Sequence, residues 1–446
     1  MMIIKKNKMQ SVFIKKSYVF LVVLLYVFSI LSVQNGYLYS TQSMFGFKEG
    51  YIDLIGFVLI FLLVFPFCFL VPITIKKPSN LIVWIVFVFI YIPSVVISIT
   101  NGTNSYENYL YSLLAFALSF ILVISFSFFC IRGWSVKPLF TFRQFMVVVT
   151  LFWCLFASIL LYNYSSVMKL SALDSIYLQR ELGKATSASM GYIQIYFAQV
   201  FTPIMFTIGL VYKRRMFIFF GLIGFVMSYS ITAEKSFILM PLMMVVISRA
   251  FSEGCIKLNK ILTSIILIAL LVLGVSLFYL DSIMFFIIGL YLVARVVATP
   301  GIMFSLYSDF ANENGYTYWT HVKGVSQFIE IPIFYANNSY FPELGRIVAE
   351  YSLGVKSNSN ANFIAADGIA ALGPVGIIII SILFGIWLLL LDTMSRRWNT
   401  QFVCCAMFPV IFAFTNGSFF TIMLSFGGIF WIMLLSLFSN TQSVKL

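Results

Sequence analysis

The feature that most constrains this chain is a series of continuous apolar runs, many of which reach the length of about 18 residues that crosses a membrane. Inside lipid, a helix of this kind satisfies its own backbone hydrogen bonds. Hydrophobic residues make up 61% of the chain and charged residues 10%, which is far from the soluble average. A β-barrel would show short segments of alternating polarity instead. The sequence therefore predicts an all-α, polytopic membrane helix bundle, with residues 1–446 as a single integral membrane domain.

We expect about twelve transmembrane helices. The first follows a lysine-rich start, as a signal peptide also would, but it is long and lacks a small-residue cleavage site, so we expect it to be retained. Basic residues gather after the second, fourth and sixth runs, for example at Lys76–Lys77 and 213–215, which places these loops and both termini in the cytoplasm. The predicted spans lie at about 17–34, 51–73, 80–100, 109–131, 144–164, 191–212, 216–232, 236–252, 259–280, 369–391, 400–415 and 418–438.

Two long loops are expected on the external face, at residues 165–190 and 281–368. The second opens with the apolar segment 282–298, whose path decides the topology. If this segment crosses the membrane, the long loop is cytoplasmic and the Arg396–Arg397 pair lies outside. If it does not cross, the pair lies inside, which the positive-inside rule favours. We therefore expect an interfacial or re-entrant helix that breaks at Pro300–Gly301.

Charge and motif content argue against several classes of function. Lys and Arg in short loops that fix topology explain the net charge of +13 better than nucleic-acid binding does. The six cysteines lie in or next to apolar runs without zinc spacing, so we interpret them as packing residues. The chain has no glycine-rich phosphate loop or HExxH motif, and His321 is its only histidine, which excludes a multi-histidine metal site. A carboxylate-bound Mg²⁺ stays open without a recognisable signature. We predict neither a metal nor a cofactor.

The candidate chemistry lies in basic residues at the outer membrane boundary. Arg295 follows an apolar run with no charge after Asp281, and a charge in such a segment costs about 2.5–3.5 kcal/mol on insertion scales. Its side chain either snorkels to the headgroups or donates paired hydrogen bonds to a lipid-borne phosphate. The alternative for Arg180 and Lys235 is a solvated surface pair or turn. The full set is Arg180, Lys184, Lys235, Arg295 and Arg346.

His321 stands in an aromatic part of the long loop. Histidine is the side chain best suited to proton transfer near neutral pH, and the alternative is a structural histidine that caps the loop. Tyr307 belongs to the aromatic residues of this region, which either stack on sugar faces or form an interfacial belt. Carboxylates that the sequence does not rank are further candidate bases, namely Asp309, Glu313, Glu330, Glu343 and Glu350.

Three short stretches, together with the layout of spans and loops, resemble the bacterial oligosaccharide repeat-unit polymerases, the Wzy-type O-antigen and capsular polysaccharide polymerases. The first stretch is the turn at 231–239, where this chain has Ala-Glu-Lys and many members have a Thr-Gly-Ser-Arg-like turn. The second is 294–301, followed by Tyr307 and Phe310. The third is 358–376, in which an Asn-rich loop end leads into Gly-Pro-Val-Gly.

The resemblance implies a metal-independent glycosyltransferase of the bacterial cytoplasmic membrane with an outward-facing site. Such an enzyme joins oligosaccharide units carried on undecaprenyl diphosphate, so we expect Arg295 and Arg180 at the diphosphate and His321, or one of the loop carboxylates, as the base. The expected substrate-binding residues are Lys235, Arg346, Lys184 and Tyr307. Membrane lipid, a chain-length regulator and a flippase are the further expected partners. The alternatives are an O-antigen-type ligase and a lipid-linked oligosaccharide flippase or transporter.

Overall fold

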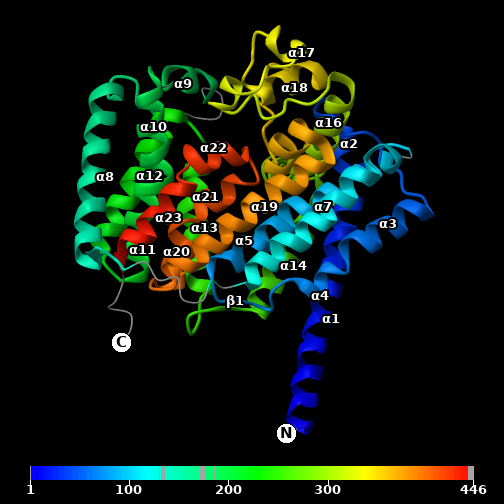
Figure 1. Ribbon diagram of the computed structural model, residues 1–446, viewed down its shortest axis with the longest axis horizontal. Helices are drawn as coiled ribbons and strands as arrows, with labels where there is room; N and C mark the ends of the chain where they lie inside the picture. The colour runs from blue at the N-terminus through cyan, green and yellow to red at the C-terminus, as the bar shows by residue number, and fades with distance from the viewer. Residues whose placement is uncertain are drawn as a thin grey trace.

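The structure is a computed structural model that describes residues 2–103, 105–129, 131, 137–170, 176–184 and 186–439. Its regular structure is almost entirely helical, as the apolar runs predict (Figure 1). The first part contains α1 (Met2–Val33), η1 (Gln34–Leu38), α2 (Tyr39–Gln42), η2 (Ser43–Phe45), α3 (Leu54–Val64), α4 (Phe67–Leu70), α5 (Pro78–Val86), η3 (Phe87–Tyr91), α6 (Ile92–Thr100) and α7 (Ser105–Phe128). The second contains α8 (Phe142–Tyr164), α9 (Ile176–Leu182), α10 (Ala188–Tyr196), η4 (Phe197–Phe201), α11 (Thr202–Val211), α12 (Arg215–Thr232) and α13 (Ser236–Ala250).

The remaining helices include the long predicted loop. Its elements and the helix before it are α14 (Leu258–Phe278), α15 (Ile283–Ile288), η5 (Gly289–Ala298), α16 (Thr299–Asn314), η6 (Val325–Gln327), α17 (Ile333–Ala336) and α18 (Leu344–Leu353). The last part contains η7 (Ala365–Ile369), α19 (Ala370–Ser395), α20 (Thr400–Ala406), α21 (Phe408–Ala413), α22 (Phe419–Leu424) and α23 (Gly428–Leu437).

Within the described residues, ten helices are long and apolar enough to cross a membrane, which confirms a multi-pass helix bundle. The number differs from the predicted twelve for identifiable reasons. The second and eighth predicted spans form shorter apolar helices, Leu54–Leu70 and Ser236–Ala250. The span expected at about 400–415 is divided into α20 and α21 at Met407. Conversely, the segment Ile283–Asn314 is long enough to be one of the ten.

The two ends of the bundle carry different structures (Figure 1). α9, α17 and α18 lie at one end, which we call the loop side. The start of α1 lies at the opposite end, which we call the terminal side, together with two short strand pairs. There, β1 (Thr74–Ile75) pairs antiparallel with β3 (Ile256–Lys257), and β2 (Phe140–Thr141) pairs in parallel with β4 (Phe438–Ser439). The described parts of the two predicted external loops therefore share one side of the molecule.

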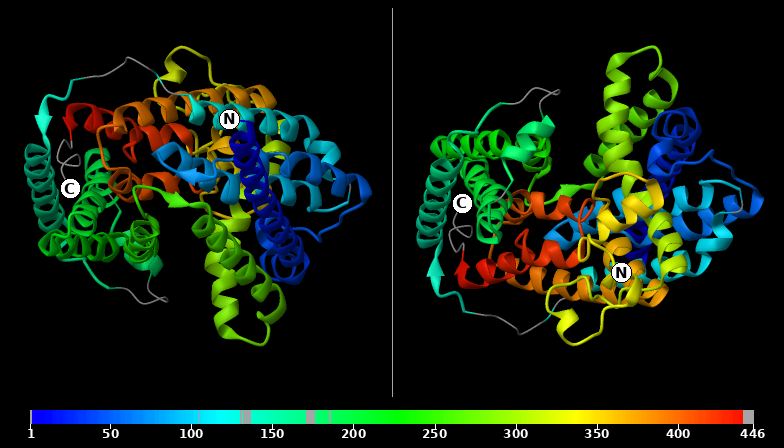
Figure 2. Two further views of the ribbon diagram at one scale, coloured as in Figure 1. Left: turned by 90° about the horizontal axis from the view of Figure 1, so that it is seen from below. Right: turned by 90° about the horizontal axis from the view of Figure 1, so that it is seen from above.

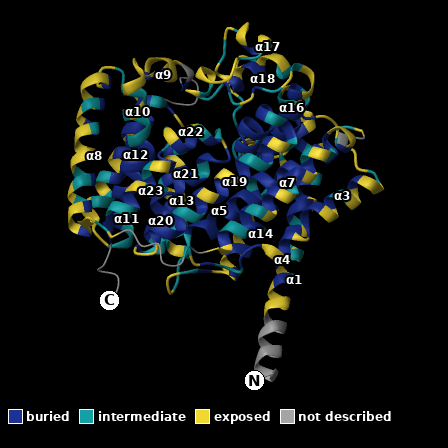
Figure 3. Cartoon of the chain, in the orientation of Figure 1, coloured by how far each residue is buried: buried dark blue, intermediate teal, exposed yellow. Residues whose placement is uncertain are grey.

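Burial separates a central helix from lipid-facing ones (Figure 3). The segment Pro78–Thr100 forms the centre, because 94% of its most apolar window is buried. The corresponding window of α8 is only 28% buried, and its outward residues Leu151 and Leu155 are exposed. Apolar side chains exposed along whole helices are expected where the surrounding solvent is lipid.

The segment predicted to be interfacial or re-entrant forms α15 and η5. Just before its start, the Tyr279 hydroxyl lies 3.1 Å from Oγ of Ser40, a residue of α2 on the loop side. Beyond its end, Tyr335 of α17 donates a 2.7 Å hydrogen bond to the carbonyl of Gly315. The contacts at the two ends of the segment 283–314 therefore both lie on the loop side of the bundle. With α14, its first part projects to one side of the bundle (Figure 2).

The expected break at Pro300–Gly301 is wrong, because one helix continues through both residues. Pro300 lies in the first turn of α16, directly after the π-helical residues of η5. The Thr299 hydroxyl donates to the carbonyl of Ala294 at 2.6 Å, and the backbone N–H of Thr299 donates to the same carbonyl. Gly301 permits close packing, since a Cβ there would lie 2.7 Å from the Pro93 carbonyl oxygen.

Candidate functional site

His321, the predicted base, lies in a buried cluster where the long loop meets the start of α19. Its Nδ1 is 2.9 Å from Thr317 Oγ1, and its Nε2 is 3.0 Å from Asp367 Oδ1. The side chain of Asp367 is 1% exposed, and its second carboxylate oxygen accepts a hydrogen bond from the backbone N–H of Phe420. Both ring nitrogens of His321 are therefore engaged. A substrate hydroxyl can reach Nδ1 only by displacing Thr317.

The same region of the loop is attached to α19 through its backbone. The N–H groups of Thr317 and Tyr318 donate to the carbonyls of Ala370 and Ala371 at 2.8 and 3.1 Å. Helical carbonyls normally accept from within their own helix. Near this point, Leu372 and Gly373 have non-helical backbone angles, so the chain is kinked here. The loop thus packs onto an irregular stretch of α19.

Asp367 was not among the predicted site residues. It is the only charged residue between positions 361 and 391. An isolated carboxylate in an apolar segment indicates a functional or specifically paired group, so the sequence did contain a signal. The structure adds a second anchor, because the indole N–H of Trp319 donates to the Asp367 carbonyl at 2.8 Å.

Arg295 lies on η5 and is exposed. Its guanidinium carbon is 5.8 Å from the centre of the Phe45 ring, which is a cation–π distance. Among the described residues, no hydrogen bond or ion pair to Arg295 is found. Because the guanidinium carries five N–H donors in a planar fork, these donors remain available to an anion from the membrane boundary.

Lys235 connects the turn after α12 to η5. Its ammonium nitrogen is 2.6 Å from the Tyr291 hydroxyl and 4.1 Å from the centre of the same ring. Tyr291 precedes Arg295 by four residues, so both side chains leave neighbouring turns of one helix. Tyr291 was also not predicted. Through this contact the Lys235 side chain packs against η5, the element that carries Arg295.

Arg180 lies on α9 and interacts with the turn that carries Lys235. Desolvation by the surrounding protein raises the pKa of Glu234 in this turn, and the positive charge of Arg180 opposes part of that increase. Gly183 lets α9 approach the end of α12, because a Cβ at this position would overlap the carbonyl of Ile231. The structure therefore connects Arg180 to Lys235 through one turn, and Lys235 to η5.

The remaining predicted cations are held in local ion pairs. Lys184 Nζ lies 2.6 Å from Glu181 Oε2, and Arg346 Nε lies 2.7 Å from Glu343 Oε2. All four side chains are about half exposed or more, so each pair contributes little to stability. Arg346 is on α18, which is a different element from those that carry the other cations.

Tyr307 is buried and supports the Asn-rich segment rather than presenting its ring to a ligand. Its hydroxyl donates to the carbonyl of Ser359 at 2.8 Å. Asn362 in the same segment is also buried, and its amide nitrogen donates to Ser94 Oγ at 3.1 Å and to the Pro300 carbonyl at 2.9 Å. The third stretch of the family resemblance is therefore a packing centre that joins α6, α16 and η7.

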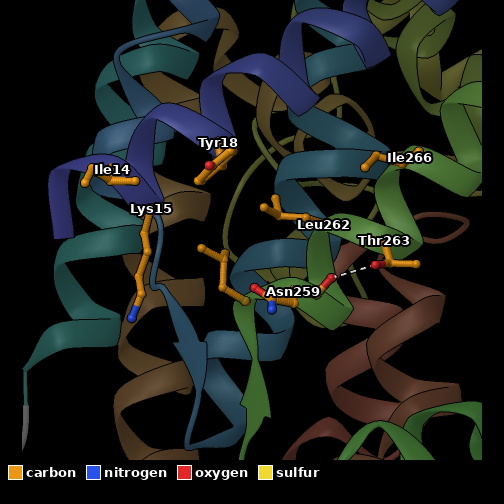
Figure 4. Close-up of a pocket in the computed structure, with 8 residues that line it drawn as sticks. Ile14, Lys15, Tyr18, Asn259, Leu262, Thr263 and Ile266 are labelled. Carbon is orange, nitrogen blue, oxygen red and sulfur yellow. Dashed lines mark hydrogen bonds between the residues drawn. The ribbon is translucent and has the colours of Figure 1, made fainter. Parts of the chain in front are cut away.

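Other regions offer less for catalysis. In the part of the chain that the structure describes, no group of three or more His, Cys, Asp and Glu side chains is placed to hold a metal ion. A groove between α1 and α14 lies on the terminal side, away from the residues above (Figure 4).

Comparison with known proteins identifies no family. No protein-family model matches the chain, and no match was found among curated proteins or solved structures. The interpretation of its function therefore depends on the loop-side geometry and on the sequence resemblance to the repeat-unit polymerases.

Proposed function

We propose that this chain is a membrane glycosyltransferase that polymerises undecaprenyl-diphosphate-linked oligosaccharide repeat units into a surface polysaccharide, either O-antigen or capsule. The observation that carries the proposal is Arg295, an exposed cation on an apolar helix without an anionic partner among the described residues. A cation in such a segment is costly unless it meets a counter-charge. The diphosphate of a lipid-linked sugar supplies that charge at the membrane boundary.

The neighbouring elements support a diphosphate site. Tyr291 on η5 accepts a hydrogen bond from Lys235, and the positive charge of Arg180 lowers the pKa of the adjacent Glu234 against the larger effect of desolvation. Positive charge near a departing diphosphate stabilises the negative charge that develops as the glycosidic bond breaks. We assign this role to Arg295 and Arg180, with Lys235 as a support.

The proposed reaction is a glycosyl transfer. A hydroxyl oxygen of the incoming unit forms a bond to the anomeric carbon of the growing chain, and the bond from that carbon to the diphosphate oxygen breaks. The hydroxyl proton passes to a base. His321 takes this role if the acceptor hydroxyl replaces Thr317 at Nδ1, because Asp367 then keeps the ring oriented through Nε2.

The orientation follows from charge. Basic residues concentrate in the terminal-side connections, at positions that include Lys76–Lys77, 213–215 and Arg396–Arg397. By the positive-inside rule this side faces the cytoplasm. The loop side, with its cations, then faces outward from the bacterial cytoplasmic membrane, where finished repeat units are presented.

Two other functions use similar features. A ligase that transfers the finished glycan to another acceptor needs the same diphosphate-binding cations. A flippase is expected to line a central path with charged residues, whereas the central segment Pro78–Thr100 of this chain contains no charged residue and is 94% buried in its most apolar window. This contrast favours glycosyl transfer at the membrane surface over transport through the centre of the bundle.

The test is the surface glycan profile of cells that lack this protein and are complemented with wild type, Arg295→Ala or Arg249→Ala. Arg249 is an exposed arginine at the end of α13 and serves as the matched control. We expect single repeat units in the deletion strain, long chains with wild type and Arg249→Ala, and a loss on the order of 100-fold in polymer with Arg295→Ala at equal expression.

Each alternative has its own outcome. Long lipid-linked chains that never reach their final acceptor indicate a ligase. Repeat units trapped on the cytoplasmic leaflet indicate a flippase. An unchanged glycan profile in the deletion strain would remove the glycan proposal altogether, and full activity of Arg295→Ala would remove the assigned role of this residue.

A further inference from the structure

The groove between α1 and α14 is separate from the loop-side cations. The two helices run parallel, because Lys15, near the start of the apolar span of α1 at Val12, and Asn259, near the start of α14, line one groove, while Ser32 and Ser276 are hydrogen-bonded near the ends of the two helices. The groove lies next to the start of α14, which directly follows β3, on the terminal side (Figure 4). Its lining consists of Ile14, Lys15, Tyr18, Leu258, Asn259, Leu262, Thr263 and Ile266.

Polarity changes along the groove. At the end near the strands, Lys15 and Asn259 expose an ammonium and an amide (Figure 4). Leu262 and Leu258 form a buried apolar floor. Ile266, two turns beyond Asn259, continues the apolar surface toward the middle of the membrane-spanning helix.

The charge of the groove is uncompensated. Its lining contains no Asp or Glu, and no ion pair to Lys15 occurs among the described residues. The nearby Lys260 differs, because its ammonium donates to the carbonyls of Arg249 and Ala250. A ligand with an anionic head at the membrane surface and an apolar tail toward the bilayer centre complements both the charge and the polarity gradient.

We propose that this groove binds an anionic glycerophospholipid from the leaflet on the terminal side. The phosphate lies at Lys15 and the Asn259 amide, and one acyl chain follows the apolar floor between the two helices. Basic pockets between membrane helices on the positively charged side bind anionic lipids in this way. Tyr18 stands at the rim, where a ring with a polar end is stable at the interface.

Anionic lipid fits better than zwitterionic lipid for an electrostatic reason. A choline head brings a positive charge next to Lys15, whereas the head of phosphatidylglycerol adds none. One basic residue near an anionic membrane surface contributes enough attraction for about a fivefold difference in binding. The site is independent of the proposed glycosyl transfer, because its residues lie on the opposite side of the bundle from Arg295.

The experiment uses the full chain purified in detergent and measures retained lipid by native mass spectrometry. The probes are phosphatidylglycerol and phosphatidylcholine of identical acyl chains. We expect wild type to bind phosphatidylglycerol about fivefold more tightly, and Lys15→Gln to lose this preference. Lys137→Gln is the matched control, since Lys137 is an exposed lysine next to β2 on the same side.

A second variant tests the groove itself. Thr263→Trp places a large ring over the apolar floor from an exposed position, and we expect it to reduce binding of the anionic probe while thermal stability stays near wild type. Equal affinity of wild type for the two lipids would overturn the proposal. The same holds if Lys137→Gln reduces the preference as much as Lys15→Gln does, or if Thr263→Trp retains the anionic lipid fully.

Discussion

Removing the imidazole of His321 should release the long loop from α19. The variant His321→Ala deletes the 3.0 Å contact to Asp367 Oδ1 and leaves this carboxylate, which is 1% exposed, with the Phe420 N–H as its remaining donor among the described residues. A hydrogen bond that involves a charged group contributes about 1.5–3 kcal/mol, and an unsatisfied buried partner costs a similar amount. At about 1.4 kcal/mol per factor of ten, the local opening equilibrium should rise roughly 10- to 100-fold.

The assay is amide hydrogen exchange of the loop in detergent. The backbone N–H groups of Thr317 and Tyr318 are protected by carbonyls of α19, so their exchange should accelerate by the factor above because exchange reports local opening. Lys323→Ala is the control, since Lys323 is exposed two residues away. Unchanged exchange in His321→Ala, or an equal acceleration in Lys323→Ala, would refute the view that His321 holds the loop.

Two further predictions concern contacts between distant segments. Tyr291→Phe removes the 2.6 Å hydrogen bond to Lys235 but keeps the ring. Polymer yield should fall about threefold to tenfold, and further in Tyr291→Ala, whereas a wild-type yield in Tyr291→Phe would contradict a role for the hydroxyl. Asn362→Ala removes two buried hydrogen bonds and places alanine at φ +74°. The free energy of unfolding should fall by at least about 1–3 kcal/mol, which lowers the aggregation temperature in detergent, whereas the exposed Asn358→Ala should match wild type.

The sequence predicted the helical membrane architecture and the grouping of loops because both follow from one-dimensional patterns. Apolar run length indicates spans, and the alternation of basic loops indicates sides. The second span ends at Leu70, earlier than the predicted 73, because apolar residues continue at Val71 and Ile73 beyond the end of the helix. The continuation through Pro300 was missed because a proline in a first helical turn has the same sequence signature as a proline that ends a helix.

The candidate site depends on contacts between residues far apart in sequence. His321 meets Asp367 across 46 positions, and Lys235 meets Tyr291 across 56. No periodicity or spacing specifies such pairs, because they arise from how helices pack in three dimensions. Residue type alone identified the cations. It did not distinguish Arg295, which has no ion-pair partner in the described chain, from Arg346, which is paired with its own helix neighbour Glu343.

The path of 283–314 shows where length alone misleads. A straight helix of 32 residues measures about 48 Å, well beyond the hydrocarbon core of about 30 Å, so by length it qualifies as a span. Contacts at both ends instead place it on the loop side, and this placement keeps Arg295 on the same side as α9 and α18.

This topology is testable with single cysteines in a background without the native ones. Asp281→Cys and Glu313→Cys mark the two exposed ends of the segment, Lys323→Cys marks the loop side and Lys76→Cys the terminal side. A membrane-impermeant maleimide added to intact spheroplasts should label the first three and spare Lys76→Cys, because all three lie on one face of the bundle. Labelling of Asp281→Cys and Glu313→Cys from opposite sides would mean that the segment crosses the membrane. The long loop would then lie on the basic side, and the assignment of Arg295 to an outward diphosphate site would fail with it.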